Sequence, residues 1–91
     1  MHSLVWTNAA RLRLAEILDY IAEFDEAAAD DLNIRINSLI DKARHFPEMY
    51  RPGRVQGTRE IVAHRNYLVI YSLTTDAIEV VAVIHARQAY P

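Results

Sequence analysis

The stretch NAARLRLAEILDYIAEFDEAAADDLNIRINSLIDKARH, residues 8–45, decides the fold, because it holds two apolar stripes at helical spacing. The first stripe recurs at steps of one, three or four residues and consists of Ala10, Leu14, Ile17, Leu18, Ile21 and Phe24. The second consists of Ala28, Leu32, Ile36, Leu39, Ile40 and Ala43. Each predicts an amphipathic helix. Because residues 24–26 interrupt the helical pattern and leave almost no linker, we expect an antiparallel helical hairpin.

The ends of both predicted helices carry capping residues. Thr7 precedes the first helix and Asp25 the second, and each side-chain oxygen can accept a hydrogen bond from a free amide of the first turn. The second helix also has acids in its first turns and bases in its last turn, which suits its dipole. These are Glu26, Asp30, Asp31, Lys42 and Arg44.

Outside the hairpin, the sequence is rich in β-forming residues. Residues 3–6 are a short β-prone segment, and after a loop at 45–57 three β-rich runs occupy 59–63, 67–73 and 78–85. Connections of about three residues predict an antiparallel meander. We therefore expect an α+β fold in which a short N-terminal strand and an antiparallel helical hairpin pack on an antiparallel three-stranded meander.

The last two runs predict a sheet that is covered on both faces over part of its length, because residues 68–71 and 80–84 are almost continuously apolar. The hairpin can cover only one face. We expect the other face to meet the neighbourhood of the first strand, a binding groove or another chain.

The composition predicts one globular domain over residues 1–91, since 52% of the chain is hydrophobic and 24% charged, with two Gly and three Pro. No apolar run approaches the roughly 18 residues that a membrane-spanning helix requires. The first residues resemble no signal peptide, so we expect a soluble, cytoplasmic protein. The absence of cysteine excludes disulfides, thiolate zinc sites and cysteine nucleophiles.

Charge is unevenly distributed within a formal net charge of −2. Residues 1–50 hold five basic and nine acidic residues, whereas residues 51–91 hold five basic and three acidic ones. Nine of the ten cations are Arg, which favours planar, bidentate contacts with carboxylates or phosphates over a diffuse polycationic surface. General coating of nucleic acid is therefore not expected.

Two segments hold the candidate binding or catalytic residues. The first, RPGRVQGTRE at 51–60, presents Arg51, Arg54 and Arg59 either to a carboxylate, phosphate or partner chain or, as a plain alternative, to solvent. Glu60 can neutralise part of this charge.

The second segment follows the last predicted strand and includes His85, Arg87, Gln88 and Tyr90. His85 can serve in acid–base roles, Arg87 can stabilise an oxyanion, and Tyr90 can stack on a base or hold a proton. In the structural alternative, His85 hydrogen-bonds at the sheet edge, Arg87 pairs with a helix carboxylate, and Tyr90 covers the core.

Other chemistries find no support in the sequence. The histidines at 2, 45, 64 and 85 lack metal-ligand spacing, and two glycines cannot build a phosphate-binding loop. Thr58 and Ser72 lie in no nucleophile-elbow motif. We expect no metal and no cofactor.

Five fragments, in this order and spacing, make the whole chain resemble a known superfamily. They are VWTNAA (5–10), FP (46–47), GRVQGTREIV (53–62), NYLVIY (66–71) and IEVVAVIHARQ (78–88). The chain resembles the RelE/ParE superfamily, the toxins of type II toxin–antitoxin modules. This resemblance implies a compact α+β toxin that a cognate antitoxin neutralises in a hetero-oligomeric complex.

Members of the superfamily act on different targets. RelE-like members cut mRNA on the ribosome, whereas ParE-like members poison DNA gyrase. The nucleases tend to carry a strand Arg directly before a Leu-Val-Tyr-like run, and here Tyr67 stands at that place, before Leu68. The run VIH at 83–85 resembles the Val-Leu-His ending of ParE-type toxins. The resemblance therefore favours a non-enzymatic inhibitor of DNA gyrase.

Two alternatives stay open. A ribosome-dependent mRNA endoribonuclease, working without metal, would use Arg54, Arg59, His85, Arg87 and Tyr90. A degenerate toxin would only bind its antitoxin. In every case we expect an amphipathic antitoxin segment along the hairpin and the exposed sheet, with acidic side chains that meet Arg54, Arg59 or Arg87. The residues predicted to bind the target or the antitoxin are Arg51, Arg54, Arg59, His85, Arg87 and Gln88.

Overall fold

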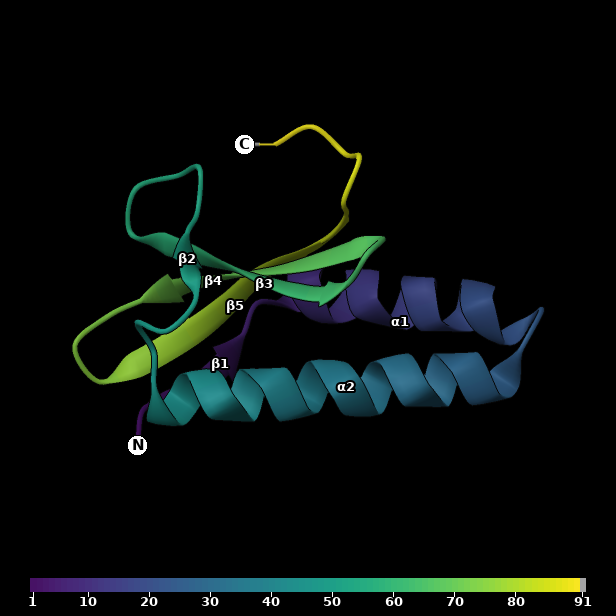
Figure 1. Ribbon diagram of the computed structural model, residues 1–91, viewed down its shortest axis with the longest axis horizontal. Coiled ribbons are helices and arrows are strands. Elements are labelled where there is room, and N and C mark those ends of the chain that lie inside the picture. The colour runs from purple at the N-terminus through teal and green to yellow at the C-terminus, as the bar shows by residue number, and fades with distance from the viewer. Residues whose placement is uncertain (91) are drawn as a thin grey trace.

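Both predicted helices form and begin where the capping residues indicated. The computed structural model describes residues 1–90 and places α1 at Asn8–Ala22 and α2 at Glu26–His45 (Figure 1). The Thr7 hydroxyl accepts a hydrogen bond from the Ala10 amide at 3.1 Å, and the Asp25 carboxylate accepts one from the Ala28 amide, also at 3.1 Å. These bonds satisfy amides that a helix leaves free in its first turn.

The sheet has five strands in the order β1-β5-β4-β3-β2. They are β1 (Ser3–Trp6), β2 (Arg51–Pro52), β3 (Thr58–His64), β4 (Tyr67–Leu73) and β5 (Ala77–His85). The predicted meander is β3-β4-β5, and its antiparallel pairing is confirmed. β1 pairs with β5 in parallel, and both helices and the other three strands lie between these two strands in the chain.

One short strand was not expected. Arg51 and Pro52 pair antiparallel with Glu60 and Arg59, although the sequence placed them in a loop. Two residues are too few for any alternation to show in a sequence. The strand is held by the amide of Gly53, which donates to the carbonyl of Thr58 at 2.8 Å.

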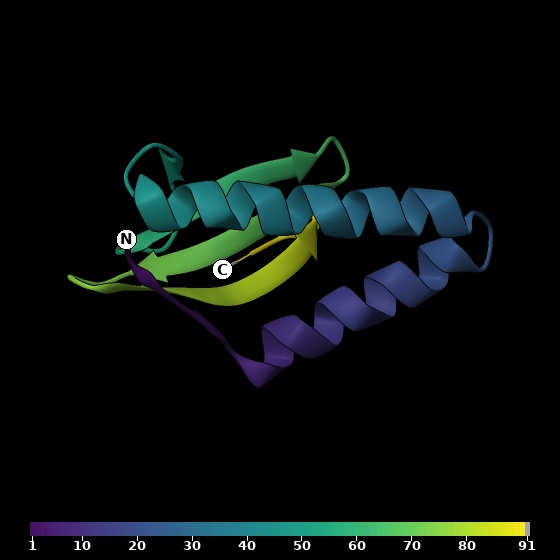
Figure 2. The same cartoon turned by 90° about the horizontal axis from the view of Figure 1, so that it is seen from below.

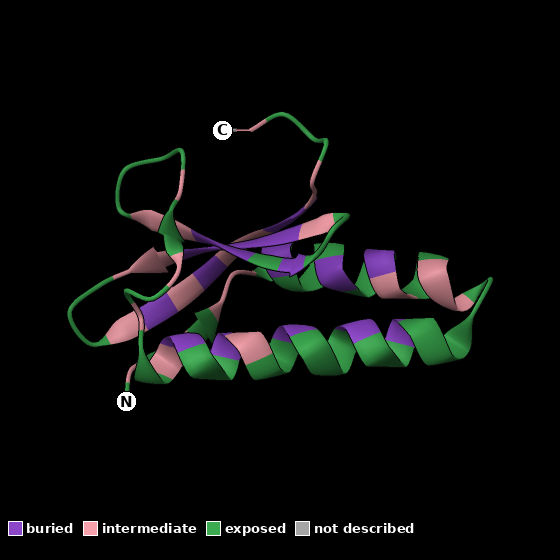
Figure 3. Cartoon of the chain, viewed as in Figure 1, coloured by how far each residue is buried: buried purple, intermediate pink, exposed green. Residues whose placement is uncertain are grey.

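The helical hairpin covers one face of the sheet, as Figure 2 shows. The apolar stripes of both helices are buried against the inner face of the sheet (Figure 3). The largest fully buried side chains there are Tyr71, Ile36, Ile40, Ile61, Ile78, Val69, Val80 and Val83.

The predicted apolar stripes are not buried as expected at the hairpin tip, which comprises residues 22–26 and the helical turns beside them. Phe24 is 75% exposed, and Ala28 is exposed while Ala29 is buried in its place. Figure 2 shows the reason, since both helices extend past the end of the sheet. Neither helix of the described residues 1–90 has the length and apolarity needed to cross a membrane.

The outer face of the sheet, the face away from the helices, carries a second apolar cluster. Its buried members are Leu68, Ile70 and Ile84, and Tyr90 packs against them. The tail, residues 86–90, curls over this face on the side opposite the helices (Figure 1). The chain's own tail therefore covers part of the face for which the sequence suggested a groove or another chain.

Candidate functional site

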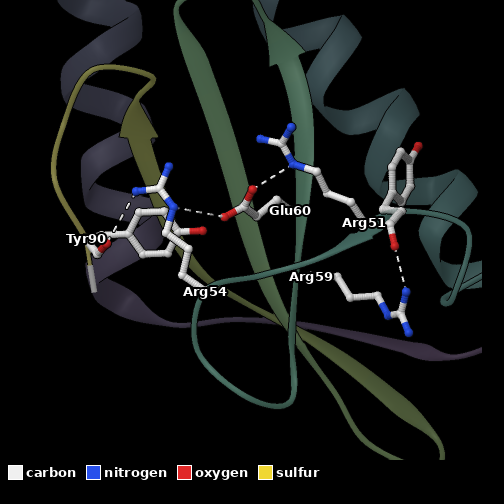
Figure 4. A network of polar contacts seen from close by, with 6 residues as sticks. Arg51, Arg54, Arg59, Glu60 and Tyr90 are labelled. Atoms are coloured by element: carbon white, nitrogen blue, oxygen red, sulfur yellow. Dashed lines mark hydrogen bonds and ion pairs between the residues drawn. The ribbon is translucent and has the colours of Figure 1, made fainter.

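The outer face holds a polar network centred on Glu60 of β3. The Glu60 side chain is only 4% exposed, and its Oε1 accepts a hydrogen bond from the Arg51 Nε at 2.7 Å. Its Oε2 lies 3.8 Å from the Arg54 Nε and has no hydrogen-bond partner (Figure 4). A buried carboxylate is costly unless it is paired, so the two Arg residues are what make this position tolerable for Glu60.

Arg54 links this network to the tail. Its guanidinium carbon lies 4.4 Å from the centre of the Tyr90 ring, and its Nη1 donates to the Tyr90 carbonyl at 3.4 Å. A cation over an aromatic face is favourable, and the contact holds the ring over the apolar outer cluster. Tyr90 thus covers apolar surface, as the structural alternative predicted, while also contacting a candidate binding residue.

The loop that carries Arg54 depends on its two glycines. Gly57 has a φ of +84°, in the left-handed region that other residues rarely adopt. At Gly53, a Cβ would collide with the Thr58 hydroxyl. Thr58 also closes the loop, because its hydroxyl donates to the Val55 carbonyl at 2.6 Å.

Arg59 points to the opposite face from Glu60, as neighbouring residues of a strand do. Its Nη1 donates to the carbonyl of Tyr50 at 2.7 Å and to that of Glu48 at 3.1 Å. Figure 4 shows it directed away from Arg51 and Arg54. Arg59 therefore anchors the segment that follows α2, a role that the sequence did not indicate.

Two tyrosines complete this anchor. The Tyr71 hydroxyl donates to the carbonyl of Pro47, and the Tyr50 hydroxyl donates to that of Leu39 at 3.1 Å. Burial raises the pKa of Tyr50. Burial also raises the pKa of Tyr71 to about 12, with the nearby charge of Arg59 acting in the opposite direction and Tyr50 adding to the rise.

His85 lies on the inner face, at the other end of the sheet. Its ring packs edge-on against Tyr67 with centroids 5.5 Å apart, and its Nδ1 accepts a hydrogen bond from the Arg87 amide at 3.2 Å. It lines a cavity of about 400 Å³ together with Arg13, Glu16 and other residues of α1. The hydrogen bond at the sheet end agrees with the structural alternative for His85.

Arg87 and Gln88 lie in the exposed turn that follows β5. The Gln88 backbone N–H donates to the His85 carbonyl at 2.8 Å, and Gln88 lines a shallow cavity of about 150 Å³ beside α1. Among residues 1–90, no helix carboxylate pairs with Arg87, so the pairing expected in the structural alternative does not form. Within the same residues, no group of three His, Asp or Glu side chains is placed to hold a metal ion.

Comparison with known proteins identifies the family. The family model described as the ParE toxin of type II toxin–antitoxin system, parDE, matches residues 4–90. The chain belongs to the ParE toxin family. A relative named "Putative toxin Y4kP", from Sinorhizobium fredii, is 39% identical to this toxin over 87 residues, which are 94% of this chain and 90% of the relative. The toxin RelE2 of Caulobacter vibrioides is 30% identical over 97% of this chain and 99% of its own.

A solved structure shows the same fold. The chromosomal ParDE toxin–antitoxin system from P. aeruginosa contains a chain that matches this toxin with a TM-score of 0.77 at 21% identity, covering 93% of this chain and 96% of the other. The resemblance to the RelE/ParE superfamily is thus confirmed for the family and the fold. Membership of a toxin–antitoxin family also implies an antitoxin partner.

The ParE-family toxin does not bring its predicted site residues together. Arg51, Arg54 and Tyr90 meet on the outer face, whereas Arg59 and His85 lie on the inner face. Through the strand pairing, Arg59 lies at the same height in the sheet as Val80 of β5. His85 is five residues beyond Val80, so at the rise of a β-strand it lies about 16 Å from that height.

Glu60 has a larger role in this toxin than the sequence indicated. The sequence indicated only a neutralising charge, whereas in the structure Glu60 joins Arg51, Arg54 and, through Arg54, Tyr90. One feature of the sequence pointed to it. Glu60 is an acid inside a predicted strand, in a segment that also holds three Arg residues, and its charge must be paired if its face of the sheet is covered.

Proposed function

We propose that this ParE-family toxin arrests growth by inhibiting DNA gyrase and has no nuclease activity of its own. The observation that carries this proposal is the separation of the residues that a nuclease would need. General acid–base catalysis requires both groups within hydrogen-bond reach of one substrate. His85 and Tyr90 lie on opposite faces of the sheet, with the strands between them.

Two other groups of the nuclease hypothesis are not accessible to a substrate. Arg59 donates to two backbone carbonyls, and the Tyr90 hydroxyl is buried. A phosphate on the outer face would meet Arg54, but no histidine stands beside it in the described network. This arrangement supports a binding surface more than a catalytic centre.

The charge distribution supports the same proposal. Residues 16–31 comprise the end of α1, the turn between the helices and the start of α2. They contain no Lys or Arg but seven acids: Glu16, Asp19, Glu23, Asp25, Glu26, Asp30 and Asp31. Such an acidic end, on a chain with a net charge of −2, opposes docking into a site formed by ribosomal RNA.

The proposal is tested with purified toxin in two assays run side by side. One measures gyrase supercoiling and the formation of cleavage complexes, and the other measures translation-dependent cleavage of mRNA on programmed ribosomes. We expect gyrase inhibition with intact mRNA, relieved by the antitoxin. Cleavage of mRNA with gyrase unaffected would show a ribosome-dependent nuclease, and inactivity in both assays would show a degenerate antitoxin-binding module.

A further inference from the structure

The Glu60 network contains hydrogen-bond donors that the fold does not use. A guanidinium has five N–H groups, and Arg51 uses only its Nε, on Glu60. Arg54 directs its Nε toward Glu60 and uses Nη1 for one long bond to the Tyr90 carbonyl. Among residues 1–90, the other terminal N–H groups of both side chains have no protein partner, and Figure 4 shows them directed away from Glu60.

These donors are accessible and held in place. The Arg51 and Arg54 side chains are 55% and 50% exposed, although their Nε atoms face a carboxylate that is 4% exposed. The Tyr90 ring supports Arg54 from one side. Long Arg side chains normally lose rotamer freedom when they bind a ligand, and side chains that are already fixed lose less.

The balance of charge indicates the kind of ligand. Arg51, Arg54 and Glu60 together carry one positive charge, and the Glu60 Oε2 between the two cations has no hydrogen-bond partner. One unit of charge suits carboxylates, which guanidinium groups bind with paired hydrogen bonds. It suits the densely charged backbone of nucleic acid poorly, the more so on a chain whose net charge is −2.

We infer that Arg51 and Arg54 form a carboxylate-binding site on the outer face of the sheet, with Glu60 as its positioning residue, and that the site takes an acidic peptide segment of a partner protein. The inference rests on the family's need for a protein partner and is independent of gyrase as the target. Arg59 is not part of the site, because its guanidinium is bound to the carbonyls of Glu48 and Tyr50.

The test uses the full-length toxin and the peptide acetyl-VEVEVE-amide, whose alternation places three carboxylates on one side of an extended strand. Two ligands serve as controls, the matched peptide acetyl-VQVQVQ-amide and the oligonucleotide hexathymidylate. We expect the acidic peptide to bind at least about tenfold more tightly than either control and to shift the Nε–H resonances of Arg51 and Arg54 in NMR spectra. Equal binding of the glutamine peptide, or tighter binding of hexathymidylate, would overturn the inference.

The Glu60→Gln variant separates positioning from simple electrostatics. Removal of a negative charge alone should strengthen binding of an acidic peptide, whereas loss of positioning should weaken it, and we expect a loss of about fivefold or more. Glu79→Gln is the matched control, since Glu79 lies in β5 of the same sheet outside the network and the substitution removes the same charge. We expect its affinity to be unchanged or slightly raised.

If Glu60→Gln binds the acidic peptide as tightly as the wild type, Glu60 is not a positioning residue and the inference is wrong. If that variant does not fold, Arg51→Gln and Arg54→Gln decide the matter, and unchanged affinity in both would overturn the inference. The gyrase assay gives a separate answer, because a toxin that binds the peptide but leaves gyrase active contradicts only the proposed function.

Discussion

At the scale of single residues, Tyr71 couples the core to the segment that follows α2. Its side chain is fully buried in β4, and its hydroxyl donates to the carbonyl of Pro47. Burial raises its pKa from 10.0 to about 12, with Arg59 partly opposing the shift. Because the neutral hydroxyl is favoured in the folded state, this group stabilises the fold fully below pH 10 and loses that contribution as the pH rises toward 12.

We therefore predict that the free energy of unfolding falls between about pH 10 and 12, by about 2 to 3 kcal/mol from Tyr71 alone. Tyr71→Phe should cost about 1 kcal/mol at pH 7, because Pro47 loses its donor, and should flatten the decline at high pH. Urea denaturation across this pH range measures both effects. The control is Tyr20→Phe, at a site that is 62% exposed. A decline in Tyr71→Phe as steep as in the wild type would contradict the assignment.

Gly57 allows a second prediction at the residue scale. Its φ is +84°, and a Cβ added there would meet nothing within 4 Å, so a substitution is opposed by backbone strain and not by a collision. We predict that Gly57→Ala lowers the free energy of unfolding by about 1 kcal/mol and that Gly57→Asn lowers it less, since Asn tolerates this conformation better. Thermal denaturation of the two variants gives the comparison, and an unchanged melting temperature for Gly57→Ala would refute the strain argument.

At the scale of elements, the amphipathic pattern of α2 predicts which face carries its stability. Ile36 is fully buried beneath the sheet, whereas Ile34, two residues away on the same helix, is 67% exposed. We predict that Ile36→Ala lowers the free energy of unfolding by about 2 to 5 kcal/mol and that Ile34→Ala changes it by less than about 0.5 kcal/mol. Equilibrium denaturation of this matched pair is the measurement. Equal losses in both variants would mean that a partner or a second copy covers Ile34.

The elements also show what local sequence can and cannot predict. The capping role of Thr7 and Asp25, the two helices and the meander follow from patterns that lie within a few residues of each other. The exposure of Phe24 does not, because it depends on where the sheet ends relative to the hairpin. The two-residue strand β2 depends on a pairing with β3 that no short pattern records.

At the scale of the whole molecule, the separation of the site into two faces was predictable only in part. That Arg59 and Glu60 point to opposite faces follows from the alternation along a strand. The path of the tail, which brings Tyr90 to Arg54, joins residues 36 positions apart and has no local signature. The sequence therefore predicted which residues belong to the site, whereas only the three-dimensional fold shows which of them lie together.

The two faces lead to a prediction about growth arrest. A nuclease that lost an acid–base group would lose about 10²- to 10⁴-fold in rate, whereas a protein-binding surface loses one contact. For a gyrase inhibitor we therefore expect His85→Ala and Arg87→Ala to weaken growth arrest by no more than about tenfold at matched expression. His64→Ala is the matched control, since His64 lies on the other side of Tyr67, with ring centroids 6.1 Å apart. Colony counts after induction measure the arrest, and a folded His85→Ala variant without toxicity, beside a toxic His64→Ala, would contradict this expectation. Cleavage of mRNA by the wild type that the His85→Ala variant has lost would overturn the gyrase proposal.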